Sequence, residues 1–194
     1  MTTPNLRFRI DNVRVSFPVL FKGDQFQGTG SFRCGTSLIV AGDHPQLKRI
    51  NAGIEEAAAA KWKDKAAVTL KAARAKDKVC LRDGDLKAKY DGYEGNWILS
   101  ANCQGGETEA ECIKPQVYDA NTILVSESGK NPVYSGCYAN ALVEFYADSR
   151  FGDGVFCKLV GIQFAKDGES FGSASAKSSD FERVTEGADA GEFA

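Results

Sequence analysis

The chain has 194 residues, a length that suits one domain with an insertion or a tail. Hydrophobic residues make up 43% of it, enough to bury a core, so wholesale disorder is excluded. The longest apolar runs, such as Leu38–Ala41, fall far short of the roughly 20 residues of a membrane span. No apolar segment follows the first charges after Met1. We therefore expect neither a membrane segment nor a signal peptide.

Six cysteines and one histidine, His44, are the soft metal ligands that the sequence offers. No two cysteines form a C-x-x-C pair, and structural zinc sites need ligands paired at short spacing. We expect no metal site and no cofactor. The cysteines are interpreted as reduced thiols of a cytoplasmic protein, several of them buried as small hydrophobic residues.

Charge is distributed unevenly along the chain, although the net charge is only −2. Residues 178–194 contain five acids and one base. Residues 61–89 contain ten bases and four acids. The chain is therefore electrically polarised, with a basic middle section and an acidic end, and this polarity needs a functional explanation.

The first predicted element is a long, bent strand. Leu6, Phe8 and Ile10 alternate with polar residues, and the alternation resumes at Val13, Val15 and Phe17 on the apolar face. Residues 11–12 interrupt the phase, which predicts a bulge or bend. We expect the strand to end at Pro18 and a second strand to cover residues 31–40, after a glycine-containing loop.

A single substantial helix is predicted over residues 45–75. Leu47, Ile50, Ile54, Ala58 and Trp62 recur at helical spacing after a start signal at residues 43–45. We expect a break near residue 53 or 64. The Lys and Arg residues at its end suit the negative end of the helix dipole, which explains part of the basic section without any ligand.

The second half of the chain is predicted to be mainly β. Candidate strands cover residues 97–103, 134–146 and 155–164, with a short edge strand over residues 113–118. The fold class is therefore mainly β with one substantial helix. An OB-fold-like, five-stranded Greek-key barrel with insertions is one candidate architecture. We place this domain at residues 1–172 and a flexible, disordered linker and acidic tail at residues 173–194.

Catalytic signatures are missing from the sequence. It has no phosphate-binding P-loop, no G-x-S-x-G elbow and no H-E-x-x-H motif. The acid pairs Asp83/Asp85 and Glu109/Glu111 are more typical of solvated turn residues than of a metal site. A non-enzymatic protein is favoured.

Cations interleaved with aromatic rings are the chemistry that single-strand binding needs, since cations follow the phosphates and rings stack on bases of any identity. The stretch Lys87–Trp97 has this composition, within glycine-rich sequence that exposes rings. Arg7, Arg9 and Arg14 share the predicted outward face of the first strand. The complete set of predicted nucleic-acid-binding residues is Arg7, Arg9, Arg14, Lys22, Phe26, Arg33, Lys76, Lys78, Lys87, Lys89, Tyr90, Tyr93 and Trp97.

The acidic tail is the more specific feature, because it has an aromatic residue, Phe193, one position from its end, and a ring in a solvated tail gains nothing from folding. This pattern indicates a pocket on a partner protein. The tail residues predicted to bind a partner are Asp180, Glu182, Glu186, Asp189, Glu192 and Phe193.

Three segments resemble a bacteriophage family of single-stranded DNA-binding proteins: Leu6–Pro18, Tyr134–Ala141 and Gly161–Glu169. The resemblance covers roughly residues 5–172. It implies an OB-fold and binding of single-stranded DNA during phage replication, recombination or repair, in the cytoplasm of the infected bacterial host. The tail is similar to the acidic, aromatic-ended tails that recruit replication or recombination proteins, although it ends Glu192-Phe193-Ala194 rather than Asp-Phe-Pro-Phe.

The sequence thus predicts a protein that binds single-stranded DNA without sequence preference. Two alternatives stay open: a phage structural or assembly protein whose β-domain binds another protein, and a magnesium-dependent nucleic-acid enzyme using carboxylates such as Asp83, Asp85 or Asp91.

Overall fold

The computed structural model describes residues 6–25 and 30–172. The predicted binding residue Phe26 and all six predicted tail residues therefore lie outside the described residues. The strands are β1 (Arg7–Asp24), β2 (Arg33–Ala41), β3 (Leu81–Asp83), β4 (Asn96–Asn102), β5 (Gln116–Tyr118), β6 (Tyr138–Asp148) and β7 (Gly154–Lys166). The helices are α1 (Leu47–Trp62) and α2 (Ala66–Ala75), with 3₁₀ turns η2 (Lys63–Lys65), η3 (Gly84–Lys87) and η4 (Glu109–Glu111).

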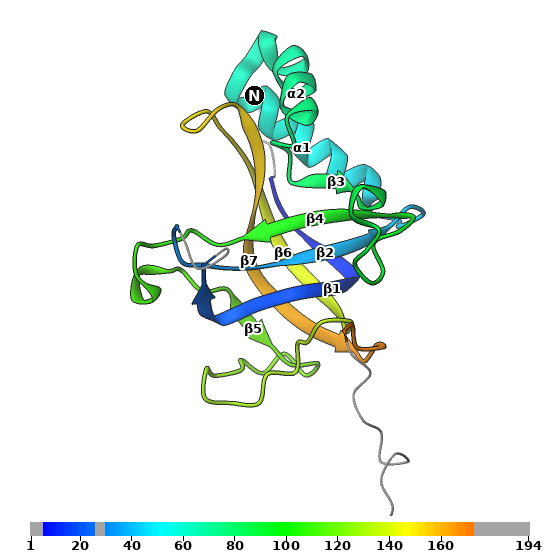
Figure 1. Ribbon diagram of the computed structural model, residues 1–194, viewed down its shortest axis with the longest axis vertical. Helices are drawn as coiled ribbons and strands as arrows, with labels where there is room; N and C mark the ends of the chain where they lie inside the picture. The colour runs from blue at the N-terminus through cyan, green and yellow to red at the C-terminus, as the bar shows by residue number, and fades with distance from the viewer. Residues whose placement is uncertain (1–5, 26–29, 173–194) are drawn as a thin grey trace, which may run out of the picture.

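Five of the strands close into a barrel (Figure 1). β1 pairs with β2 on one side and β6 on the other, β2 pairs with β4, and β6 pairs with β7, all antiparallel. A parallel pairing between β4 and β7 closes the ring. This is the strand order of the OB-fold, so the predicted five-stranded Greek-key barrel is confirmed. β3 and β5 are additional short strands, and β5 is the predicted edge strand.

The bend in β1 lies where the interrupted alternation placed it. The register against β6 shifts between Ile10 and Val13, and Asn12 has a left-handed φ of 52°. The strand does not end at Pro18, as predicted, but continues to Asp24 through a second register shift between Ser16 and Val19. Proline lacks an N–H donor, and a register irregularity is one of the few sheet positions that tolerates it.

The predicted single helix is two helices joined by η2 (Figure 1). The break lies at residues 63–65, as expected near Asp64, and Lys63 has a φ of 50°. The alternative break point, Gly53, lies within α1, where an added Cβ would lie only 3.1 Å from the rings of Phe8 and Phe145. Gly53 therefore serves close packing of the helix on the barrel rather than ending the helix.

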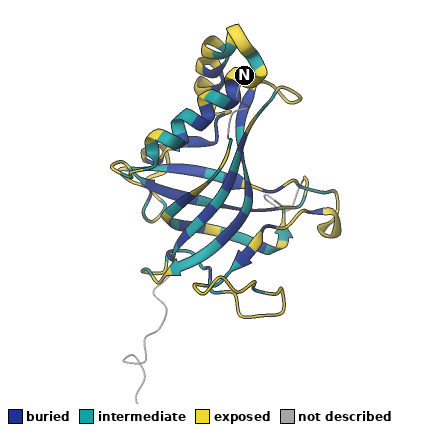
Figure 2. Ribbon diagram, turned by 180° about the vertical axis from the view of Figure 1, so that it is seen from behind, coloured by how far each residue is buried: buried dark blue, intermediate teal, exposed yellow. Residues whose placement is uncertain are grey.

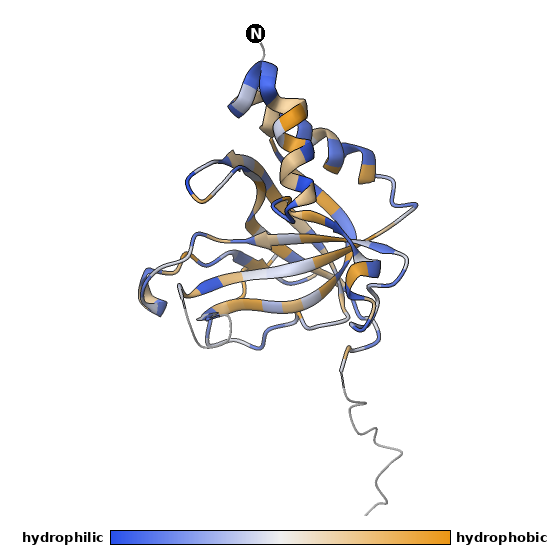
Figure 3. Cartoon of the chain, turned by 45° about the horizontal axis from the view of Figure 1, so that its top comes forward, coloured by the Kyte–Doolittle hydropathy of each residue, from blue (hydrophilic) through white to orange (hydrophobic). Residues whose placement is uncertain are grey.

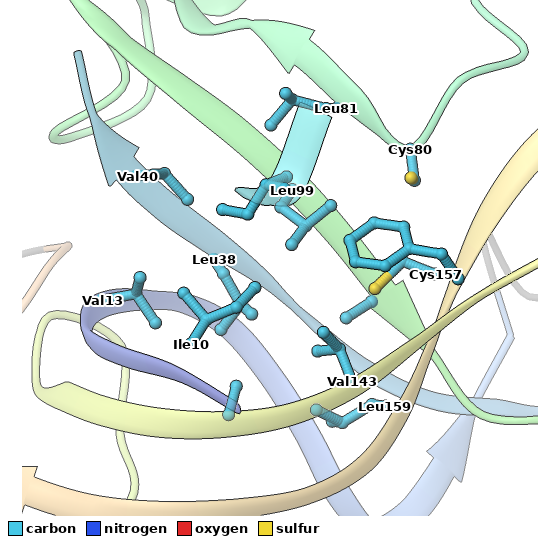
Figure 4. Close-up of a cluster of buried hydrophobic side chains, with 14 of the residues drawn as sticks. Ile10, Val13, Leu38, Val40, Cys80, Leu81, Leu99, Val143, Cys157 and Leu159 are labelled. Carbon is cyan, nitrogen blue, oxygen red and sulfur yellow. The ribbon is translucent and has the colours of Figure 1, made fainter. Parts of the chain in front are cut away.

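The core fills the barrel and continues under the helical pair (Figures 2 and 4). Val13, Leu38, Leu99 and Leu159 point into it from four strands, while Ile54 joins from α1. All six cysteines are buried and free, in agreement with the expectation of reduced thiols. None of the helices in the described residues has the length and apolar character needed to cross a membrane.

Candidate nucleic-acid interface

Small residues line the outer face of the second and third barrel strands, β2 and β4. Ser37 is paired with Ser100 and Gly35 with Asn102, between inward-facing pairs such as Leu38 and Leu99. Ser16 of β1 continues the row opposite Ser37, although this residue is itself buried. We call these five residues the polar strip. The corresponding face of OB-folds carries their oligonucleotide ligands, together with the loops that join strands one to two and four to five.

Gly35 keeps the polar strip shallow. An ideal Cβ at this position would collide with the side-chain oxygen of Asn102 and lie 2.6 Å from the carbonyl oxygen of Ala101. Only glycine therefore fits without displacing β4. The consequence is a strip without large side chains, across which a strand of nucleotides can lie.

An aromatic shelf stands at one end of the polar strip. Tyr93 is 3% exposed and packs on Ile39 and Ile98, which continue the outer face of β2 and β4. Tyr90 packs on this cluster and meets the ring of Phe17 edge to face, at 5.3 Å between centroids. We call Phe17 and Tyr90 the aromatic shelf. Phe17 is 55% exposed and Tyr90 is half-buried, so most of the accessible ring surface belongs to Phe17.

Phe17 was predicted on the apolar face with Val13 and Val15, and that prediction is wrong. The φ angle of Phe17 is 50°, which breaks the alternation of β1 and turns the side chain outward. Tyr93, by contrast, was predicted as a stacking residue, but its ring is buried, so it supports Tyr90 rather than contacting a base. The alternation of apolar and polar residues in the sequence does not reveal that a residue other than glycine has a left-handed backbone.

Aspartate side chains in and next to the loop that carries Tyr90 hold the loop by accepting hydrogen bonds from backbone N–H groups. The Asp83 side chain accepts a hydrogen bond from the backbone N–H of Asp85 at 2.9 Å, and the Asp85 side chain accepts one from Gly95 at 2.7 Å. Asp91 accepts one from the N–H of Gly172 at 3.0 Å. These carboxylates thus cap loop N–H groups. Among the described residues, no group of three or more His, Cys, Asp or Glu residues is arranged to hold a metal ion.

The three predicted strand arginines are not brought together at the strip. Arg7 and Arg9 lie on the part of β1 that pairs with β6, where Arg7 is opposite Glu144 and Arg9 forms an ion pair with Asp11 at 2.5 Å. Arg14 uses its guanidinium inside the protein, donating to the carbonyl oxygens of Gly136 and Glu169. The three arginines do lie on the outward face of β1, since Ile10, Val13 and Val15 are buried on the other face, and their contact with nucleic acid stays a prediction.

The other predicted cations occupy three places. Arg33 and Lys22 are exposed next to the loop that joins β1 to β2, at the end of the strip opposite the aromatic shelf. Lys87 and Lys89 are exposed in the loop of the shelf, and the Lys89 ammonium lies 5.2 Å from the Tyr90 ring centre. Lys76 and Lys78 follow α2 and lie beside the start of β7 instead.

Trp97 belongs to the core side of the barrel. It is paired with Val40 on β2, is half-buried, and packs against the core. His44 is also occupied structurally, since one ring nitrogen lies 2.9 Å from the Asp11 carbonyl oxygen and the other accepts from the Gln46 N–H. Neither residue is placed to act on a ligand at the strip.

Burial keeps the thiols neutral and unreactive. Desolvation raises the pKa of the Cys80 and Cys103 thiols to about 12. The Cys34 thiol, 3.7 Å from the sulfur of Cys112, also has its pKa raised to about 12 by burial and by its thiol neighbour. These cysteines lack the electropositive, accessible setting of catalytic thiols.

Known proteins resemble this chain over most of its length. A curated relative, the putative protein p50 of Acyrthosiphon pisum secondary endosymbiont phage 1, is 37% identical over 169 residues, covering 86% of both chains. The single-stranded DNA-binding protein of bacteriophage Enc34, solved in complex with single-stranded DNA, has a TM-score of 0.68 at 21% identity, covering 87% of this chain and 90% of that one. Gp2.5 of bacteriophage T7, a single-stranded DNA-binding protein, has a TM-score of 0.55 at 12% identity, covering 94% and 98%.

The comparison with protein-family models gives a match over nearly the whole chain. A sequence profile described as the single-stranded DNA-binding protein of Enterobacter phage Enc34 matches residues 7–193. This chain belongs to that family of phage single-stranded DNA-binding proteins.

Proposed function

We propose that this protein binds single-stranded DNA across the polar strip, without sequence preference, and that Phe17 and Tyr90 stack on bases there. The observation that carries the proposal is the Phe17–Tyr90 ring pair at the end of the strip, in which Phe17 is exposed and Tyr90 is half-buried. Every base has a π-face, so stacking holds a strand regardless of sequence. Arg33 and Lys22 at one end, and Lys87 and Lys89 at the other, neutralise phosphates.

The biological role follows from this binding mode. The protein, which is not an enzyme in this proposal, covers single strands and protects them during phage replication, recombination or repair in the cytoplasm of the infected host. The same proposal assigns the six acidic and aromatic tail residues to recruitment of replication or recombination proteins. Removing residues 178–194 is expected to leave affinity for DNA unchanged or higher, because the tail carries four net negative charges.

The test is an anisotropy titration of single- and double-stranded oligonucleotides of unrelated sequence, at two salt concentrations. Phe17→Ala is expected to lower affinity for the single strands about fivefold to a hundredfold, the value of one base stack. Ile123→Ala is the matched control, since this side chain is 63% exposed and lies outside the strip and the shelf. Binding should also weaken steeply with salt.

The two alternatives predict other results in the same titration. A protein-binding assembly domain would have no salt-sensitive affinity for oligonucleotides. A magnesium-dependent enzyme would turn over labelled DNA until a chelator is added. Equal affinity of Phe17→Ala and the unsubstituted protein would refute the location of the site.

A further inference from the structure

The described chain ends against the floor of the aromatic shelf. We call residues 169–172, which follow β7, the strap. The end of the described chain and the loop that carries Tyr90 lie on the same side of the barrel (Figures 1 and 3). Within the strap, the Phe171 ring packs on the buried cluster around Tyr93, and Tyr90 packs on the same cluster. The strap therefore shares its support with one of the two rings of the shelf.

The strap also contacts the two residues that follow Tyr90. Gly92 has a left-handed φ of 75°, and an added Cβ there would lie 2.9 Å from Cζ of Phe171. The side chain of Asp91 accepts a hydrogen bond from the Gly172 N–H at 3.0 Å. Tyr90 therefore lies where its loop is fixed to the strap by both packing and a hydrogen bond.

Ser135 connects the strap to Phe17, the other ring of the shelf. The Ser135 carbonyl oxygen accepts a hydrogen bond from the Phe171 N–H at 3.0 Å, and its hydroxyl oxygen accepts a longer one from the Phe17 N–H at 3.4 Å. The next residue, Gly136, permits the close approach of the strap, because an added Cβ would collide with the Glu169 carbonyl oxygen. This turn thus contacts both the strap and the backbone of Phe17.

These contacts affect how strongly the shelf can stack. A ring that is already in place stacks more tightly, because the free energy of ordering a loop on binding is subtracted from that of the contact. The loop of Tyr90 consists of turns, and the Tyr90 ring is only half-buried. Its order therefore depends on contacts with neighbouring segments, and the strap supplies a ring contact and a hydrogen bond.

We propose that the strap positions the aromatic shelf for stacking, with Phe171 as a positioning residue that holds Tyr90 and Phe17 in place without contacting DNA. The inference rests on the proposed function, since it assumes that these two rings stack on bases. Coupling of this kind is reciprocal, so DNA bound at the shelf in turn stabilises the strap. The contact of the Phe171 ring with Arg14 at 4.2 Å is additional, so removal of Arg14 is expected to leave the strap in place.

The first test measures the affinity of the 194-residue protein for an oligothymidylate by anisotropy, under conditions where every variant is folded. Phe171→Ala is expected to lower affinity about fivefold to a hundredfold, the value of one base stack. Phe171→Met keeps most of the apolar volume and is expected to recover most of the affinity. An unchanged affinity of Phe171→Ala, or an equal loss in Phe171→Met, overturns the inference.

Asp91 provides a test whose sign separates positioning from electrostatics. Asp91→Ala removes the partner of the Gly172 N–H together with a negative charge. Positioning predicts that affinity falls about twofold to tenfold, the value of one hydrogen bond, although loss of a negative charge by itself favours binding to phosphates. Glu94→Ala is the matched control, since Glu94 is also exposed on this loop and its removal leaves the Gly172 hydrogen bond intact. Affinity that stays unchanged or rises in Asp91→Ala contradicts positioning by the strap.

A double-mutant cycle shows whether Phe171 acts through the shelf. In the Tyr90→Ala background, Phe171→Ala is expected to lower affinity less than about threefold further, because one of the rings that it positions is already absent. In the Lys22→Gln background, which changes the opposite end of the strip, the full loss is expected to remain. Equal losses in the two backgrounds would mean that Phe171 does not act through Tyr90.

Hydrogen exchange supplies a readout that a merely structural role does not change. The Phe171 and Gly172 amides are bonded to Ser135 and Asp91, so their exchange reports opening of the strap. Saturating oligothymidylate is expected to slow both amides about fivefold or more in the unsubstituted protein, and by a smaller factor in Tyr90→Ala. Equal rates with and without DNA in the unsubstituted protein would show that the strap only packs on the barrel.

The outcomes separate this inference from the proposed function. If Tyr90→Ala and Phe17→Ala both leave affinity unchanged, the site proposed at the shelf is wrong, whatever the strap does. If either ring variant weakens binding while Phe171→Ala and Asp91→Ala do not, the strap is not a positioning element and the proposed function stands.

Discussion

The guanidinium of Arg14 lies 4.2 Å from the centre of the Phe171 ring, and this contact joins the middle of β1 to the end of the described chain. The same side chain donates to Gly136 at 3.0 Å and to Glu169 at 2.7 Å. Phe171 in turn packs on the cluster beneath the aromatic shelf. Arg14 is therefore a structural clamp, although its charge and position in the sequence are those of a phosphate contact.

Arg14→Ala is expected to lower the free energy of unfolding by about 2 kcal/mol, through loss of two charged hydrogen bonds and a cation–π contact. Affinity for single-stranded DNA should change less than about twofold under conditions where the variant is folded. Urea unfolding and anisotropy measure the two quantities. Arg7→Ala is the control, with a stability change within about 0.5 kcal/mol. A large loss of affinity without a loss of stability would show that Arg14 contacts DNA rather than stabilising the fold.

Gly35→Ala tests the close approach of β2 and β4. The added methyl group has no space between Asn102 and the Ala101 carbonyl oxygen, so the barrel must open at the polar strip. We expect the free energy of unfolding to fall by about 1–3 kcal/mol, the usual range for overpacking. Gly42→Ala is the control, since its nearest neighbour would be the Gly95 carbonyl oxygen at 3.7 Å. Equal thermal midpoints of the two variants would contradict this account.

Because the buried thiols have raised pKa values, we expect the free energy of unfolding to fall at alkaline pH. Burial raises the pKa of Cys80 from 9.0 to about 12, so the folded state keeps a proton that the unfolded state releases. The stabilisation is complete below pH 9 and is lost between pH 9 and 12, at about 1.4 kcal/mol per pH unit for one thiol. Urea unfolding at several pH values measures the slope. Cys80→Ala should make it shallower by that amount, and an unchanged slope would show that this thiol does not contribute.

Local patterns predicted the local features of this fold well. The interrupted alternation at Asn12 and the helix break near Asp64 both follow from a few neighbouring residues. The three-residue strand β3 is too short to have a period, and it was not predicted. Closure of the barrel rests on the pairing of β4 with β7, between residues far apart in sequence, so pattern alone left the OB-fold as one candidate.

The site was harder to predict because its chemistry depends on distant contacts. The partners of Arg14 are 122 and 155 residues away along the chain, and nothing near Arg14 shows that its charge is occupied. Phe17 is exposed only because of its own left-handed backbone. Tyr90 and Tyr93 have the same composition around them, yet one borders the surface and the other is buried.

Tyr90 and Tyr93 therefore provide a paired test of stacking against packing. Their rings lie 5.4 Å apart, but Tyr93 is 3% exposed, so Tyr93→Ala should cost about 3 kcal/mol of stability as a cavity in the cluster with Ile39 and Ile98. Tyr90→Ala should lower single-strand affinity about fivefold to a hundredfold and cost far less stability. Tyr90→Phe keeps the stacking surface and should restore most of the affinity. Weaker binding by Tyr90→Phe, to the level of Tyr90→Ala, would mean that the hydroxyl rather than the ring contacts DNA.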